Sequence, residues 1–209
     1  MRISFRLLTA AALVAAVQNP LGAQLRSNWS AQASGLFSDF TGNSFSHINS
    51  GWGIELQARR RITRLWSVGC GFQGTYHAHR APTGDVRFEG GFCEPRKAWA
   101  IKNESIYPYL GLRGAFVHRS DSNNDSTSFN ASANGWTTNL GAGIMVPVGA
   151  KTARFPFLIE LGGSVGYASF NDLVFDRNDQ IIVTTRAGGH GVMYMLRAGV
   201  AVGLLAGHP

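Results

Sequence analysis

Charge is scarce in this sequence, and that scarcity excludes several ordinary classes of protein. Charged residues make up 15% of the 209 residues, whereas a typical soluble domain has roughly 25%. Only three lysines are present, and the densest basic run is Arg59–Arg61 followed by Arg64. Binding to nucleic acid needs lysine and arginine gathered into one stripe or patch. The net charge of +7 therefore does not predict a nucleic-acid partner.

Long apolar runs are also missing, and this excludes a transmembrane helix, which needs about 18 to 20 consecutive apolar residues. The apolar stretch Leu7–Val17 is too short for that role and follows the basic start Met1–Arg6. Small residues ending at Ala23 then form a cleavage site. This order is typical of a secretory signal peptide. We therefore predict a signal peptide over residues 1–23 and a mature domain over residues 24–209.

What the chain does contain is an alternation of apolar and other residues with a period of two. It recurs in eight segments, among them Trp29–Phe37, Trp52–Arg59 and Trp136–Val146. A period of two indicates strands, and segments of roughly ten residues are typical of membrane barrels. The predicted connections alternate between short ones, Ile62–Arg64, Lys102–Glu104 and Gly149–Thr152, and longer ones, Ser38–Ser50, His77–Asp85, His118–Ala133 and Ser169–Gly188. The sequence thus predicts an all-β fold, with both termini at the end of the short connections.

Alternation alone leaves open which face points outward, because a soluble barrel places its apolar face inside. Three features favour a membrane barrel. The polar face is rich in glycine, serine and isolated ions, which suits a narrow interior. All seven aspartates fall in the longer predicted connections. Aromatic residues gather at both ends of the strands, as interfacial belts do: Trp29, Trp66, Trp99 and Phe157 at one end, and Phe37, Trp52, Tyr76, Trp136 and Tyr167 at the other.

The chain therefore resembles the small OmpA/OmpX-like outer-membrane barrels over residues 24–209. The resemblance rests on strand number, alternation, the asymmetry of the connections and segments such as Tyr107–Gly111. It implies a closed antiparallel eight-stranded transmembrane β-barrel in a bacterial outer membrane, exported with a cleaved signal peptide. It also implies outer-membrane lipids, lipopolysaccharide and the barrel-assembly machinery as partners, and no cofactor.

Seven charged residues occupy the inward face of the predicted strands. We expect them to pair in an ion network that fills the lumen, since an unpaired buried charge is very costly: Glu55, Arg59, Glu94, Arg96, Arg113, Glu160 and Arg197. A narrow pore is the alternative. An eight-stranded barrel is just wide enough for its own side chains, which favours structural filling.

Other candidate chemistry is weaker. His77 and His79 have the spacing of two metal ligands on one strand face, but no third ligand follows at a defined spacing, so we predict no metal. The same parity places His118 on the outer face. The segment Ser46–Ser50 contains histidine and serine, the residues that lipid A-modifying barrels use, but sequence does not reveal the geometry that nucleophilic catalysis needs. We predict a non-enzymatic protein that acts through its loops.

The two cysteines, Cys70 and Cys93, lie in a predicted hairpin. Export to an oxidising compartment would permit a disulfide, and the expected register brings Cys70 within one residue of Cys93. The alternation of side chains along a strand opposes the bond. If Val86 faces outward, Cys93, an odd number of positions away, faces inward. A bulge at Gly90–Gly91 would reverse the face and unite the two thiols. The sequence leaves open a cross-strand disulfide and two unpaired cysteines.

Overall fold

The computed structural model describes residues 28–80, 84–101, 105–123, 130–148, 157–177, 180–186 and 189–204. The predicted signal peptide lies outside these described residues. No helix in the described part of the chain is long and apolar enough to cross a membrane.

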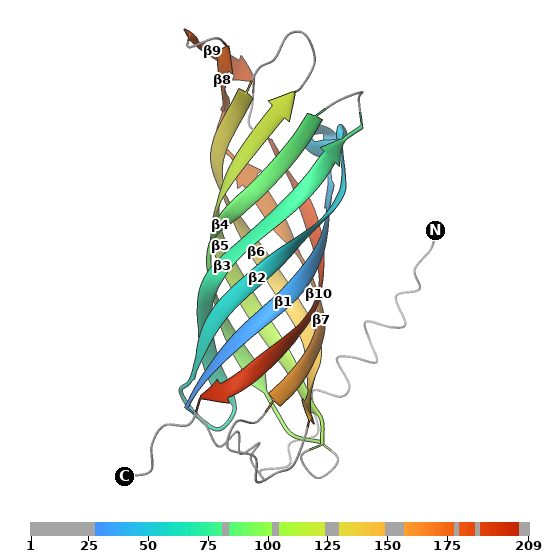
Figure 1. Cartoon of the computed structure of the whole chain (residues 1–209), viewed down its shortest axis with the longest axis vertical. Helices are drawn as coiled ribbons and strands as arrows, with labels where there is room; N and C mark the ends of the chain where they lie inside the picture. The colour runs from blue at the N-terminus through green and yellow to red at the C-terminus, as the bar shows by residue number, and fades with distance from the viewer. Residues whose placement is uncertain are drawn as a thin grey trace.

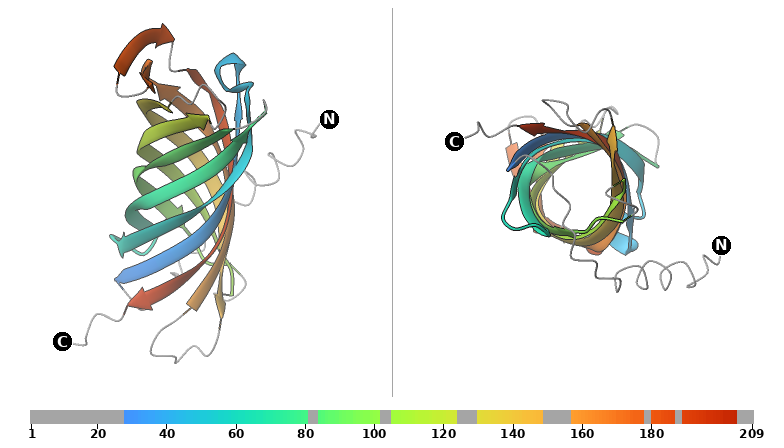
Figure 2. Two further views of the ribbon diagram at one scale, coloured as in Figure 1. Left: turned by 45° about the horizontal axis from the view of Figure 1, so that its top comes forward. Right: turned by 90° about the horizontal axis from the view of Figure 1, so that it is seen from below.

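Eight long antiparallel strands close into one barrel, as the alternating pattern predicts (Figures 1 and 2). Each strand pairs with its neighbour in the chain, and pairing of the first with the last closes the ring. The strands are β1 (Trp29–Thr41), β2 (Ile48–Arg61), β3 (Trp66–His79), β4 (Gly84–Ala98), β5 (Tyr107–Asn123), β6 (Asn130–Val148), β7 (Phe157–Phe170) and β10 (His190–Leu204).

Two small elements extend the upper end of the barrel in Figure 1. The hairpin of β8 (Leu173–Arg177) and β9 (Gln180–Arg186) continues the sheet, because β8 pairs with the first residues of β6. A 3-10 turn, η1 (Asn43–Phe45), joins β1 to β2 and places Phe45 in the interior. The first residue of β1 and the last of β10 pair at the opposite end.

The outer face carries large apolar side chains in contact with the surroundings. Exposed fractions reach 66% for Trp52, 65% for Phe116 and 62% for Leu140 and Leu196. Burying apolar surface contributes roughly 25 cal/mol per Å², so a water-soluble protein rarely exposes so continuous an apolar band. The polar partners of the alternation point into the barrel, which is the polarity of a membrane barrel.

Several predicted boundaries are wrong, because the strands continue beyond the apolar band. β5 runs to Asn123 and β6 begins at Asn130, so most of the connection predicted between them is sheet. Four aspartates expected in connections, Asp39, Asp85, Asp121 and Asp176, lie in strands. The backbone ladder remains paired where the side chains stop alternating in polarity, and polarity was the only signal available to sequence reasoning.

Candidate functional site

The interior of the barrel is the first candidate site. The seven charged residues expected there project from five strands: Glu55 and Arg59 from β2, Glu94 and Arg96 from β4, Arg113 from β5, Glu160 from β7 and Arg197 from β10. Side chains at every second strand position face the same side, so each pair on one strand has an even spacing. The structure brings all seven into one connected group.

Glu94 lies at the centre of this network. Four guanidinium groups approach its carboxylate, with N–O distances of 2.7 Å for Arg96, 2.6 Å for Arg113, 3.0 Å for Arg197 and 3.6 Å for Arg59. The Glu94 side chain is only 4% exposed. Such short, buried, charge-assisted contacts hold their partners far more firmly than surface pairs do.

The carboxylates of Glu55 and Glu160 join the same arginines from the opposite side of the lumen. Arg113 reaches Glu55 at 2.6 Å, and Arg197 reaches the same carboxylate at 3.3 Å. Glu160 accepts a hydrogen bond from Arg96 at 2.9 Å and forms an ion pair with Arg197 at 2.9 Å. Four arginines face three glutamates, so the network carries a net charge of +1 (4 − 3). These contacts run between strands on different sides of the barrel and therefore span the lumen.

Tyr109 is the participant that sequence reasoning missed. Its hydroxyl donates to Glu160 at 2.8 Å and accepts from Arg197 at 3.0 Å, while the Arg96 guanidinium lies 3.9 Å from the ring centroid. Gly143 and Gly162 make room for this ring, because a Cβ at either position would collide with the tyrosine hydroxyl. The pattern placed Tyr109 on the inward face, but only the packed structure reveals its partners.

An apolar plug fills the lumen toward the end that carries β8 and β9. Phe88 packs against Phe40 with ring centroids 4.7 Å apart and against Phe170 at 5.4 Å. Phe45 and Val86 are also buried in this cluster, at 1% and 0% exposed. Close-packed aromatic rings leave no continuous space for water. The described lumen is therefore filled by two successive layers, one charged and one apolar.

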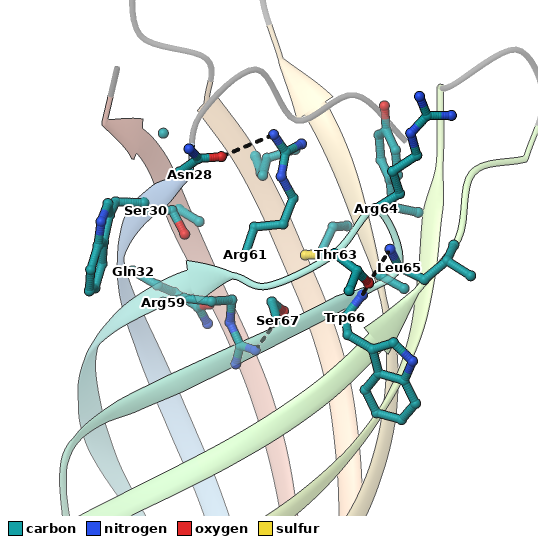
Figure 3. A pocket seen from close by; sticks show the side chains of 17 residues that line it. Asn28, Ser30, Gln32, Arg59, Arg61, Thr63, Arg64, Leu65, Trp66 and Ser67 are labelled. Carbon is teal, nitrogen blue, oxygen red and sulfur yellow. Dashed lines mark hydrogen bonds between the residues drawn. The ribbon is translucent and has the colours of Figure 1, made fainter. Parts of the chain in front are cut away.

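Below the charged layer lies a small cavity at the short-turn end (Figure 3). Its volume is about 50 Å³, enough for a few water molecules since one water needs roughly 10–15 Å³ by the same kind of measure. Arg59 lines it and donates to Ser67 at 3.1 Å, while Arg61 donates to Asn28 at 3.3 Å across the mouth. Arg59 therefore belongs both to the lining of this cavity and to the ion network.

The cysteines lie outside the barrel wall and form a disulfide. Cys70 pairs directly with Cys93 in the β3–β4 ladder, which runs without interruption from Trp66 to Ala78. The bulge at Gly90–Gly91 that the sequence offered as a way to unite the two thiols is not formed in this ladder. Sequence reasoning assumed that Val86 and Phe88 face outward, whereas both belong to the apolar plug, so one unbroken alternation already turns Cys93 outward.

The loop-end histidines are not arranged as a metal site. His77 is buried, and its Nδ1–H donates to the Asn49 carbonyl oxygen at 2.9 Å. The Nε2 of the neutral ring then accepts from Ser38 Oγ at 3.1 Å. His47 and His79 stack with centroids 5.4 Å apart, but Arg119 Nη2 lies 3.1 Å from His47 Nε2. Among the described residues no group of three or more His, Cys, Asp or Glu side chains could hold a metal ion.

The structure also bears on two further residues named from the sequence, Ser46 and Trp99. Ser46 Oγ donates to the Asn43 carbonyl oxygen at 2.9 Å within the η1 turn, so it serves local structure beside His47. Trp99 was expected in the aromatic belt at the short-turn end, but it follows β4 as a half-buried residue whose Nε1 is buried. The other predicted belt members are all at least partly exposed on the outer face.

Comparison with solved structures finds outer-membrane barrels. Neisserial surface protein A matches with a TM-score of 0.54 and 16% identity, over 85% of this chain and 98% of that chain. Ail of Yersinia pestis and OprG of Pseudomonas aeruginosa match with TM-scores of 0.48 and 0.47, at 16% and 11% identity, over 84% and 86% of this chain and 98% and 97% of theirs. No family model and no curated protein matches the chain. The first match and the closed sheet together establish the fold of a small eight-stranded outer-membrane barrel.

Proposed function

We propose that this protein spans a bacterial outer membrane as a closed barrel and acts through the end that projects outside the cell. The observation that carries this proposal is the inverted polarity of the wall. Apolar side chains such as Trp52, Phe116 and Leu196 face outward, while seven charged residues pair inside. Such a wall is stable only where lipid surrounds it.

The upper end of the strands supports a role in surface interactions. On β5, the outward apolar series ends at Phe116, and His118 and Ser120 follow on the same face. The ladder with β6 nevertheless continues to Ser122. A paired hairpin that leaves the apolar band with a polar outer face projects into water. We propose that these projecting hairpins, with the connections between them, contact partners outside the cell. Lipopolysaccharide and other outer-membrane lipids would surround the apolar wall below them.

A pore is the weaker alternative, because two layers fill the described lumen. Ions would have to separate the contacts of Glu94 with Arg113 and Arg197, and then pass the rings around Phe88. Removing one partner from a buried ion pair costs about 3–5 kcal/mol, so a spontaneous opening of the charged layer is rare. We propose that the filled lumen makes the barrel rigid and does not conduct.

Membrane fractionation combined with a heat-modifiability gel tests the proposal. The folded barrel is expected in the outer-membrane fraction and should migrate faster when unheated than after boiling. Planar-bilayer recording then separates the closed wall from the pore, since the closed barrel should give no unitary conductance steps. Recovery from the soluble fraction would overturn the membrane role, and reproducible steps that Glu94→Gln alters would overturn the closed lumen.

A further inference from the structure

A row of polar side chains crosses the outer wall where the apolar band ends. Glu89 on β4 pairs in register with His118 on β5, and His118 pairs with Asn134 on β6. All three are exposed on the outer face. His118 Nδ1 lies 2.9 Å from Asn134 Oδ1. An amide oxygen only accepts, so the imidazole carries its proton on Nδ1 and leaves the Nε2 lone pair free to act as a base.

Ser120 follows two positions along β5, on the same face as His118. Two residues along a strand span about 7 Å, a separation that a histidine and a serine side chain can bridge together. The register therefore places a candidate nucleophile and a candidate base two positions apart on β5, with a group that orients the base opposite them on β6. Hydrolytic triads combine the same three roles. On the other side of Ser120, the ladder places Arg87, which is exposed and whose guanidinium lies 5.9 Å from the centroid of the Tyr76 ring.

The height of this row matches the ester region of a lipid. Phe116 and Trp136, one row below His118 and Asn134, pair across β5 and β6 and are 65% and 50% exposed. An aromatic pair of this kind marks the boundary between acyl chains and headgroups. Lipid acyl esters lie at the same boundary, so the serine and histidine stand where an ester bond would meet them.

A groove of about 310 Å³ on the outer surface leads to the row. Trp52, Ile54 and Phe72 form its apolar walls, and Arg87 and Glu89 form its polar end. Gly74 also lines the groove, and a side chain at this position would have room, because a Cβ there would meet no atom closer than 3.8 Å. Cross-strand neighbours lie about 5 Å apart, so Glu89 joins the end of the groove to His118. The groove thus offers apolar side chains to an acyl chain and the Arg87 guanidinium to a phosphate.

We propose that this face of the barrel hydrolyses a long-chain acyl ester of a phosphate-bearing membrane lipid. The activity goes beyond the surface role proposed above, departs from the non-enzymatic expectation of the sequence, and rests on the same membrane orientation. Ser120 and His118 are the catalytic residues. Asn134 is a positioning residue that holds the imidazole, and Arg87 binds the phosphate.

The chemistry balances with water as the second substrate. Ser120 Oγ attacks the ester carbonyl carbon while its proton passes to His118 Nε2. The bond from that carbon to the lipid alcohol breaks, and the alcohol leaves with the proton. Water then attacks the acyl–serine ester, giving one proton to His118 and its oxygen to the released fatty acid. The proton returns to Ser120, and the enzyme is regenerated.

The test uses the full chain, purified from outer membranes in detergent and shown to be folded by heat modifiability. It is mixed separately with micelles of diacyl phosphatidylethanolamine and with micelles of lipid A, and released fatty acid is measured by mass spectrometry. Release from one lipid and not the other identifies the source of the ester. A long-chain alkyl fluorophosphonate should also label the folded protein at the peptide that contains Ser120.

Variants separate catalysis from structure. Ser120→Ala should lower the rate about 100-fold or more, since nucleophile and base act as one unit. Ser122→Ala, two positions farther along the same strand, should stay within about twofold of the unmodified protein. Asn134→Ala should lower kcat at least tenfold, whereas Asn134→Asp, which still accepts from Nδ1, should restore most of it. Gly74→Leu should raise KM and leave kcat unchanged.

A folded barrel that releases no fatty acid from either lipid and takes no label would overturn the hydrolase. Label on a residue other than Ser120, or equal activity of Ser120→Ala, would overturn it as well. Either result in protein recovered from the outer membrane leaves the surface role standing. Recovery from the soluble fraction would instead overturn the proposed membrane role itself, and with it the premise of this activity.

Discussion

Replacing Glu94 by glutamine should destabilise the barrel more than any other single change in the ion network. Its carboxylate contacts four guanidinium groups, the nearest at 2.6 Å and 2.7 Å. Without that charge, four arginines face two glutamates, and the buried net charge rises from +1 to +2 (4 − 2). Breaking a buried ion pair by removing one partner costs about 3–5 kcal/mol, and we expect the free energy of unfolding to fall by at least that amount.

Glu89→Gln is the matched control, because it makes the same chemical change on the exposed outer face. It should cost less than about 0.5 kcal/mol. The measurement is a urea titration of the barrel in phospholipid vesicles, followed by tryptophan fluorescence. Equal and small losses in the two variants would refute the network as a stabilising element and show that Glu94 is hydrated.

Removing a positive charge from the network, by the substitution Arg113→Ala, gives a second test of it. Arg113→Ala leaves three arginines and three glutamates, so the lumen becomes neutral, but Glu55 and Glu94 each lose a contact of 2.6 Å. We expect a loss of about 3–5 kcal/mol. Leu112→Ala, 52% exposed toward lipid, should cost much less. Combined with Glu94→Gln, the arginine change should cost less than the sum of the two, with a coupling of about 0.5–3 kcal/mol; strict additivity would contradict a shared network.

Three further outcomes are expected. An epitope inserted in the connection between β5 and β6 should be labelled on intact cells, and labelling only after the outer membrane is breached would reverse the topology. Cys70 and Cys93 should be recovered as one cross-linked peptide pair from unreduced, alkylated protein, and mass spectra with two alkylated thiols would reject the bond. Phe88→Ala should cost about 3–5 kcal/mol because it opens a cavity in the apolar plug. Phe116→Ala, at a position that is 65% exposed, should cost far less in the same urea titration. Equal losses would show that the plug is loosely packed.

Sequence reasoning succeeded where one face of a strand differs clearly from the other. Trp136, Leu140 and Ile144 alternate with Thr137 and Asn139, and the structure places the first set outward and the second inward. It failed in β4, where Val86 and Phe88 are apolar and yet face inward. Polarity reports the environment of a side chain and not the direction of its Cβ, so an apolar plug inside the barrel is invisible to it.

The row on the outer wall shows the same limit. Parity alone placed His118 outward, and nothing in the spacing of the chain linked it to Asn134 or Glu89. The register of β4, β5 and β6 brings these residues side by side. Register is set by the hydrophobic pattern and by the turn that joins two strands. The apolar alternation did not locate those turns, because the strands continue beyond it.

The sequence by itself determined that the chain forms eight alternating strands, that their apolar faces point to lipid, and that seven charges share the interior. These features follow from local periodicity and from the cost of an unpaired charge in a low-dielectric space. The tertiary structure alone decided which charges meet, that Tyr109 joins them between two glycines, and that Cys70 lies opposite Cys93. Those contacts join strands far apart in the chain, and only closure of the barrel sets the register and shear that align them.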